Sequence, residues 1–133
     1  MKRSLVKVSF PDGKKIDATI GEFTINTDQK KENGGDESAP EPFQLFLASI
    51  ATCAGIYALN FCQARHIPLD GMSLSMECER DENENRYPKM SINLKLPEGF
   101  DEKYRKAIIR SMDLCSVKKH MLNPPEFEIT TSY

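Results

Sequence analysis

Two of the four cysteines lie in sequence contexts that suit thiol chemistry. Cys53 lies in the middle of residues 43–62, a run of 20 uncharged and mostly apolar residues. Cys115 lies at a predicted junction between two helices and is followed by Lys118, Lys119 and His120. Backbone amides at a helix start and nearby cations lower the pKa of a thiol. On these grounds Cys115 is the better candidate for a thiolate, although either cysteine taken alone could be a small buried core residue.

The other two cysteines have simpler interpretations. Cys78 alternates in register with Met72, Leu74 and Met76, which is the pattern of one face of a strand, so we expect an inert core thiol. Cys62 follows Cys53 by nine residues, and nine helical steps of about 100° place the two thiols on opposite sides of a helix. Cys53 and Cys62 therefore cannot face the same pocket.

Composition limits the kind of protein and of partner. The 133 residues fit one domain, and 18 basic against 20 acidic residues give a net charge of −2, too balanced for a nucleic-acid-binding surface. We expect small-molecule or protein partners. No apolar segment follows residues 1–3, which begin like an export signal, so we expect a cytoplasmic protein with free cysteines. His66 and His120 are the only histidines and no CxxC pair occurs, so neither a metal nor another cofactor is expected.

Cys53 belongs to a predicted helix of about 25 residues. The prolines at 40 and 42 suit a first helical turn, and Ile67-Pro68 ends the helix because the residue before a proline avoids helical geometry. The run is long enough to cross a bilayer, but its polar residues and unbracketed ends favour a buried central helix over a membrane span. A chain this small can hardly cover every face of such a helix, so a second subunit is expected to help.

Alternating residues predict strands around this helix. A hairpin is predicted over residues 6–20 with a turn at 11–13, followed by a third strand at 23–25. Residues 27–39 are polar and predict a mobile loop, either gating a site or merely connecting elements. A longer hairpin covers residues 72–96, helices cover 101–114 and 116–122, and alternation at 127–133 predicts a closing strand.

Two motifs resemble the OsmC/Ohr family. The segment from Pro42 to Cys53 resembles the family's proline-led apolar run toward a helix cysteine, and Cys115-Ser116-Val117 resembles its second motif. The two cysteines are 62 residues apart, which is similar to the family's spacing, and Gly34-Gly35-Asp36 is similar to a lead-in of one OsmC-like subgroup. The resemblance spans the chain as a single OsmC-like domain, residues 1–133. It implies an α+β fold, with antiparallel sheets around a long central buried helix, in an intertwined homodimer.

The resemblance also implies a chemistry. In the family's peroxidase members, the cysteine matching Cys53 attacks a hydroperoxide and becomes a sulfenic acid. The cysteine matching Cys115 then captures it as a disulfide, and a dithiol reductant restores both thiols. Residues 53 and 115 would be nucleophile and resolving thiol of a hydroperoxide reductase, a peroxiredoxin-like activity in oxidative stress.

The chain departs from the family pattern at two points. Gln44 stands where the family usually has a glutamate, and no arginine matches the one that pairs with that glutamate; Lys30 and Lys31 lack its planar guanidinium. Gln44 could still donate a hydrogen bond to a thiolate or ligand. Three hypotheses follow: a hydroperoxide reductase using Cys53, Cys115 and Gln44; a redox sensor or small-ligand-binding dimer without efficient turnover; and a structural dimer with inert thiols.

Overall fold

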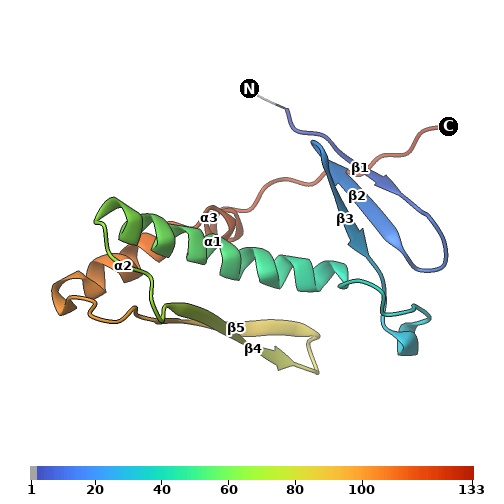
Figure 1. The fold of residues 1–133 in the computed structure, drawn as a ribbon. Helices are drawn as coiled ribbons and strands as arrows, with labels where there is room; N and C mark the ends of the chain where they lie inside the picture. Colours follow the sequence, from blue (N-terminus) through green and yellow to red (C-terminus); the bar gives the residue numbers. More distant parts are fainter. Residues whose placement is uncertain (1–2) are drawn as a thin grey trace. The chain divides into compact units, whose positions relative to one another are not determined.

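The computed structural model describes residues 3–133 (Figure 1). Met1 and Lys2, which open the signal-like segment, lie outside the described residues. The chain divides into two compact units, Met1–Ala48 and Ser49–Tyr133. A single OsmC-like domain remains a prediction.

The first unit is built on a three-stranded antiparallel sheet. Its strands are β1 (Val6–Ser9), β2 (Ile16–Ile20) and β3 (Phe23–Thr27), in the order β1-β2-β3. The turn after β1 is closed by the Lys15 amide, which donates to the carbonyl of Asp12 at 3.0 Å. The predicted hairpin and third strand are confirmed.

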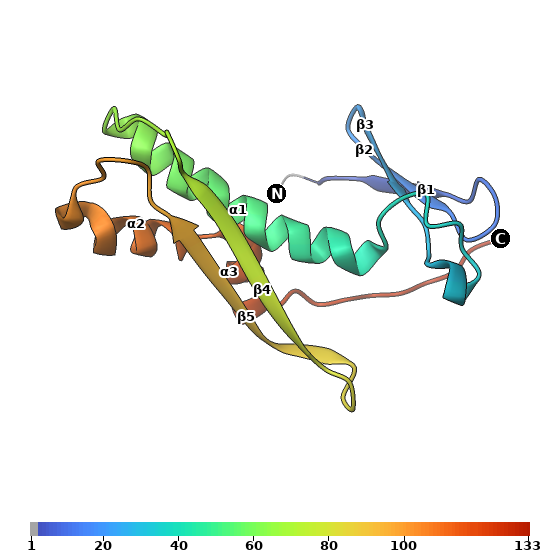
Figure 2. The same ribbon diagram turned by 60° about the horizontal axis from the view of Figure 1, so that its bottom comes forward.

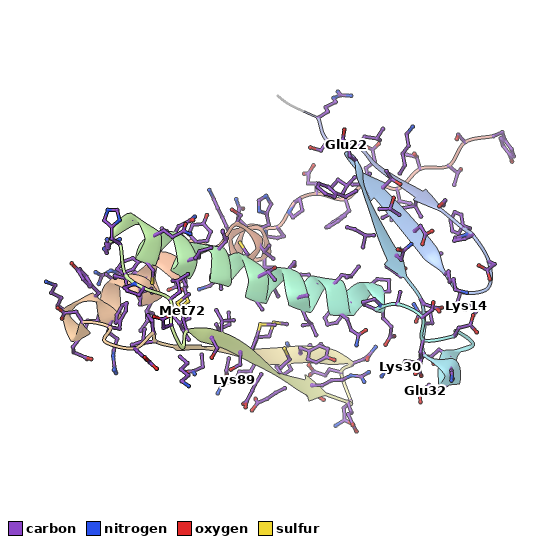
Figure 3. The ribbon with its side chains drawn as sticks, viewed as in Figure 1. Lys14, Glu22, Lys30, Glu32, Met72 and Lys89 are labelled. Atoms are coloured by element: carbon purple, nitrogen blue, oxygen red, sulfur yellow. The ribbon has the colours of Figure 1, made fainter. Side chains whose placement is uncertain are left out.

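The polar segment after β3 is held by its own hydrogen bonds. The carboxylate of Asp28 is fully buried and accepts from the amides of Gln29 (2.8 Å), Asp36 (3.3 Å) and Ser38 (3.1 Å), and from the Ser38 hydroxyl (2.6 Å). A short 3₁₀ helix, η1 (Lys31–Asn33), lies within this loop; Figure 3 labels Lys30 and Glu32 there. The sequence predicted the loop, but not the buried carboxylate that organises it.

The long helix α1 (Pro42–Ala64) confirms the predicted helix and ends slightly earlier than expected. His66 has a positive φ of 55°, its amide donates to the carbonyl of Gln63, and the amide of Ile67 donates to Cys62 at 2.9 Å. These two bonds are the Schellman arrangement, with histidine in the left-handed position that glycine usually fills. The helix therefore stops through this motif, and Pro68 only follows it.

The second unit contains the predicted long hairpin, β4 (Ser73–Asp81) and β5 (Arg86–Lys95). Its strands pair Leu74 with Leu94 and Cys78 with Met90, so these apolar side chains share one face. Figures 1 and 2 show the hairpin running beside the part of α1 that belongs to this unit.

Two short helices complete the second unit. They are α2 (Arg105–Met112), preceded by a 3₁₀ turn η2 (Glu102–Tyr104), and α3 (Ser116–Leu122). Four buried residues join α1 to α2 in the core: Ala58, Phe61, Cys62 and Ile108. Met72, just before β4 (Figure 3), and Leu94 of β5 pack against this core, so the hairpin also contributes to it.

The predicted closing strand is wrong for this single chain. Residues 123–133 form neither strand nor helix, and the side chains of Phe127, Ile129 and Tyr133 are exposed. An alternating segment becomes a strand only when a neighbouring strand satisfies its amides and carbonyls. No such neighbour pairs with this tail in the described chain.

Candidate thiol site

The structure brings Cys53 and Cys115 together within the second unit. Cys53 projects from the middle of α1 and is half-buried, whereas Cys115 precedes the first residue of α3 and is only 2% exposed. The two sulfurs are close enough for a hydrogen bond between the thiols. Both cysteines are free thiols. Residues 62 positions apart in the chain therefore meet as a sulfur pair.

The surroundings give the two thiols opposite proton affinities. The hydrogen bond from Cys115 is the largest cause that lowers the pKa of Cys53, and the backbone amides of Val117 and Ser116 add to it against the opposing effect of burial. Burial is the largest cause that raises the pKa of Cys115, followed by its hydrogen bond to Cys53. Of the two thiols, Cys53 is therefore the one that loses its proton first.

This assignment corrects the expectation drawn from the sequence. The amides at the start of α3 do favour a thiolate: those of Val117 and Ser116 lower the pKa of Cys53, and those of Lys118 and Val117 act in the same direction on Cys115. At Cys115, however, burial and the interaction with Cys53 outweigh them and raise the pKa. The cations that follow Cys115 have other partners: Lys118 Nζ lies 2.5 Å from the Asp113 carboxylate, and His120 Nδ1 lies 2.7 Å from the carbonyl oxygen of Ser116. Proximity in sequence therefore suggested the wrong thiol.

Gln44 has a structural role at the start of α1. Its side-chain oxygen accepts from the amide of Glu41 at 2.9 Å, which satisfies one of the unpaired donors at the helix N-terminus. The Lys30 ammonium lies 4.0 Å from the carboxylate of Glu41. Gln44 and Lys30 belong to the first unit and the two cysteines to the second, so a shared site with Cys53 stays a prediction.

The remaining cysteines lie in the packed part of the second unit. Cys62 is fully buried in the core, and burial raises the pKa of its thiol. Cys78 lies opposite Met90 in the β4–β5 hairpin, on the apolar face that the sequence predicted.

A partly open cavity of about 320 Å³ in the second unit has Cys115 in its lining. Its walls come from α1, β5, α2 and α3 and are mainly apolar, with Lys118 and Asp113 as the charged groups. The apolar side chains that line it are Ile50, Ala54, Met90, Ile92, Ile109, Met112 and Met121. No pattern in the sequence predicts this cavity, because it depends on how four elements pack.

Two further observations limit the kinds of site. Among residues 3–133, no group of three or more His, Cys, Asp and Glu side chains could hold a metal ion. Helix α1 is long and apolar enough to cross a membrane by length and composition, and 28% of its most apolar window is buried in the described chain. Much of the helix surface thus lacks cover from this single chain.

Comparison with known proteins gives the family. The model of the family described as OsmC-like protein matches residues 34–130. A search of curated protein sequences finds no match to this chain.

Solved structures share the fold at low sequence identity. A Psychrobacter arcticus protein described as an osmotic stress induced and detoxification response protein has a TM-score of 0.75 at 20% identity, covering 90% of this chain and 88% of its own. The OsmC-like protein of Mycoplasma pneumoniae has a TM-score of 0.72 at 15% identity, with 92% and 89% covered. An organic hydroperoxide resistance protein, OsmC, of Legionella pneumophila has a TM-score of 0.59 at 19% identity, with 91% and 90% covered. The α+β fold with antiparallel sheets and the matched residues together show that this chain belongs to the OsmC-like protein family.

Proposed function

We propose that the protein reduces hydroperoxides, with Cys53 as nucleophile and Cys115 as resolving thiol. The observation that carries the proposal is the contact between the side chains of Cys53 and Cys115, which lowers the pKa of Cys53 and raises that of Cys115. It supports a thiolate at the attacking position and keeps the second thiol within reach. The family includes a neighbour named as an organic hydroperoxide resistance protein, which supports a peroxide-related redox role.

The chemistry balances with these two groups and an external dithiol. The Cys53 thiolate attacks the terminal oxygen of ROOH, the O–O bond breaks, and the alkoxide leaves as ROH after taking a proton. Cys53 is then a sulfenic acid. The sulfur of Cys115 attacks it, water leaves, and a Cys53–Cys115 disulfide forms. A dithiol reductant exchanges with this disulfide, is itself oxidised, and returns both cysteines to thiols.

Gln44 is proposed to assist the reaction through a hydrogen bond from its side chain. The N-terminal cap of α1 uses its amide oxygen, and the NH₂ group is the part that would donate to a thiolate or to a peroxide oxygen. A neutral amide offers this bond without the charge repulsion of a carboxylate. We further propose that the reaction takes place in the cytoplasm, where dithiol reductants are maintained.

A second copy of the chain is proposed as the partner that covers α1. The helix has exposed apolar side chains, including Phe43 and Ile56, the latter 46% exposed. The unpaired tail with Phe127 and Ile129 would gain strand partners in an intertwined homodimer.

Light scattering after gel filtration tests this dimer and should give twice the chain mass. Ile56→Glu should shift the measured mass toward that of a single chain, whereas the control Lys89→Glu, on the hairpin, should not. A single-chain mass for the wild type at micromolar concentration would refute this.

The peroxidase proposal is tested by rapid oxidation of the reduced protein. Stopped-flow thiol loss with an organic hydroperoxide and with hydrogen peroxide should exceed the rate of free cysteine at the same pH. Cys53→Ser should abolish the fast phase, and Cys62→Ser should leave it unchanged. Oxidation no faster than free cysteine with both peroxides would overturn the proposal.

The cavity favours one alternative function, the binding of a small ligand or redox sensing without efficient turnover. Cys115 is part of the lining, Cys53 is not, and the walls are mainly apolar, so an apolar ligand could occupy the cavity without any reaction at Cys53. Slow thiol oxidation combined with saturable binding of an apolar compound, measured by calorimetry, would favour this alternative.

A further inference from the structure

Three methionines line the cavity that reaches Cys115. They come from different elements: Met90 from β5, Met112 from the last residue of α2, and Met121 from α3. The whole chain has six methionines, so half of them meet at one cavity. This concentration of thioethers arises from tertiary packing, because the three residues belong to one strand and two separate helices.

A thioether can accept an oxygen atom from a peroxide without first losing a proton. The reaction therefore needs no thiolate and no charged partner, only an oxidant held against the sulfur. The cavity has the properties required to hold an apolar one, since Ile50, Ile92 and Ile109 form much of the remaining wall. A bulky apolar hydroperoxide gains more from entering it than hydrogen peroxide does.

We propose that Met90, Met112 and Met121 form a second oxidation site, which takes oxygen from apolar hydroperoxides held in the cavity. The terminal oxygen of ROOH transfers to the thioether sulfur, the O–O bond breaks, and the products are methionine sulfoxide and ROH. The sulfur is oxidised by two electrons and the hydroperoxide is reduced by two, with no other reactant. This inference rests on the proposed function in one respect only, that an organic hydroperoxide enters the cavity; it does not require Cys53 to react.

Oxidation at this site has a consequence for the cavity. A sulfoxide is polar and larger than a thioether, so it disfavours apolar occupants next to Ile50 and Ile109. Methionine oxidation would reduce later binding of apolar hydroperoxides beside Cys115. Oxidation of these methionines would then limit the entry of further hydroperoxide into the cavity until the sulfoxides are reduced.

The experiment separates this site from the cysteine chemistry. The Cys53→Ser/Cys115→Ser double variant is treated with cumene hydroperoxide or with hydrogen peroxide, and sulfoxide is measured at each methionine by peptide mass spectrometry. Trypsin places the three cavity methionines on separate peptides, residues 90–95, 111–118 and 120–133. Met72 and Met76, on peptide 66–80, are matched controls: they are half-buried like Met90 and Met112 but lie outside the cavity lining.

The readout is the ratio of cumene hydroperoxide oxidation to hydrogen peroxide oxidation at each methionine. We expect this ratio to be at least about threefold higher at the cavity methionines than at Met72 and Met76, because the cavity concentrates the apolar reagent. Cumyl alcohol should suppress the difference by occupying the cavity, and urea should remove it. Equal ratios at all five methionines in the folded protein would overturn the inference. That result would leave the peroxidase proposal, which is measured on cysteine oxidation in the wild type, unaffected.

Discussion

Replacing Gly35 with alanine tests the packing of the loop between β3 and α1. A methyl group added at Gly35 would lie 2.1 Å from the carbonyl oxygen of Gln29 and 2.5 Å from its carbon. Such atoms normally stay more than about 3 Å apart, so the two sides of the loop must separate by about 1 Å. The cost is steric rather than conformational, since only the space around Gly35 is restricted.

The expected cost follows from the bonds that this separation weakens. The amide of Gly35 donates to Lys30 at 3.0 Å, and the amide of Glu37 donates to Gln29 at 3.0 Å. At a net contribution of about 1 kcal/mol each, their loss lowers the free energy of unfolding by about 2 to 3 kcal/mol once the residual clash is included. For a chain of this size that corresponds to a fall in Tm of about 10 °C.

Urea unfolding followed by far-UV circular dichroism measures this change. Asn33→Ala is the control, because Asn33 lies exposed in the same loop and its replacement should alter stability by less than about 0.5 kcal/mol. A Gly35→Ala protein as stable as Asn33→Ala would show that the loop does not pack as described.

Three further predictions concern the core, the buried carboxylate and the thiols. Ile108→Ala should destabilise the protein by about 2 to 5 kcal/mol in the same urea assay, because Ile108 is 0% exposed, whereas Ile109→Ala, at a site 52% exposed, should cost far less. Hydrogen bonds, first from the hydroxyl of Ser38, lower the pKa of Asp28 from 3.8 to about 2. Its charge therefore stabilises the fold fully above pH 3.8, and this contribution is lost as the pH falls toward 2. In acid titrations, the difference in stability between the wild type and Asp28→Asn should shrink over that range. A difference that does not change with pH would contradict the lowered pKa. Iodoacetamide at pH 6 should alkylate Cys53 before buried Cys62 in mass-mapped time courses, and the reverse order would refute the assigned pKa directions.

Local patterns in the sequence predicted most elements. Alternation located the β4–β5 hairpin because one face of each strand is apolar, and the paired prolines located the start of α1. The predicted end of α1 was about three residues late. The helix ends where His66 adopts a left-handed conformation, and a histidine in the sequence does not by itself predict that conformation.

Features that depend on distant contacts were not predicted. The burial of Asp28 requires donors from Gln29 to Ser38 to close around it, and a polar run in sequence looks the same with or without that closure. The order of the two thiol pKa values was inferred wrongly because the burial of Cys115 and its contact with Cys53, which the sequence does not reveal, outweigh the amides of α3. The closing strand failed for a related reason: its alternation is real, but the strand needs a neighbour.

The fate of the first oxidised sulfur tests the central claim most directly. Reduced Cys115→Ser protein is treated with one equivalent of organic hydroperoxide in the presence of dimedone, which traps sulfenic acids, and the adduct is located by mass spectrometry. The account predicts dimedone on Cys53, no adduct on Cys115 in the matching Cys53→Ser protein, and a Cys53–Cys115 disulfide in the wild type. The account would be contradicted if the Cys53→Ser protein carried dimedone on Cys115 while the Cys115→Ser protein carried none on Cys53. A wild-type protein that forms no Cys53–Cys115 disulfide would also contradict it.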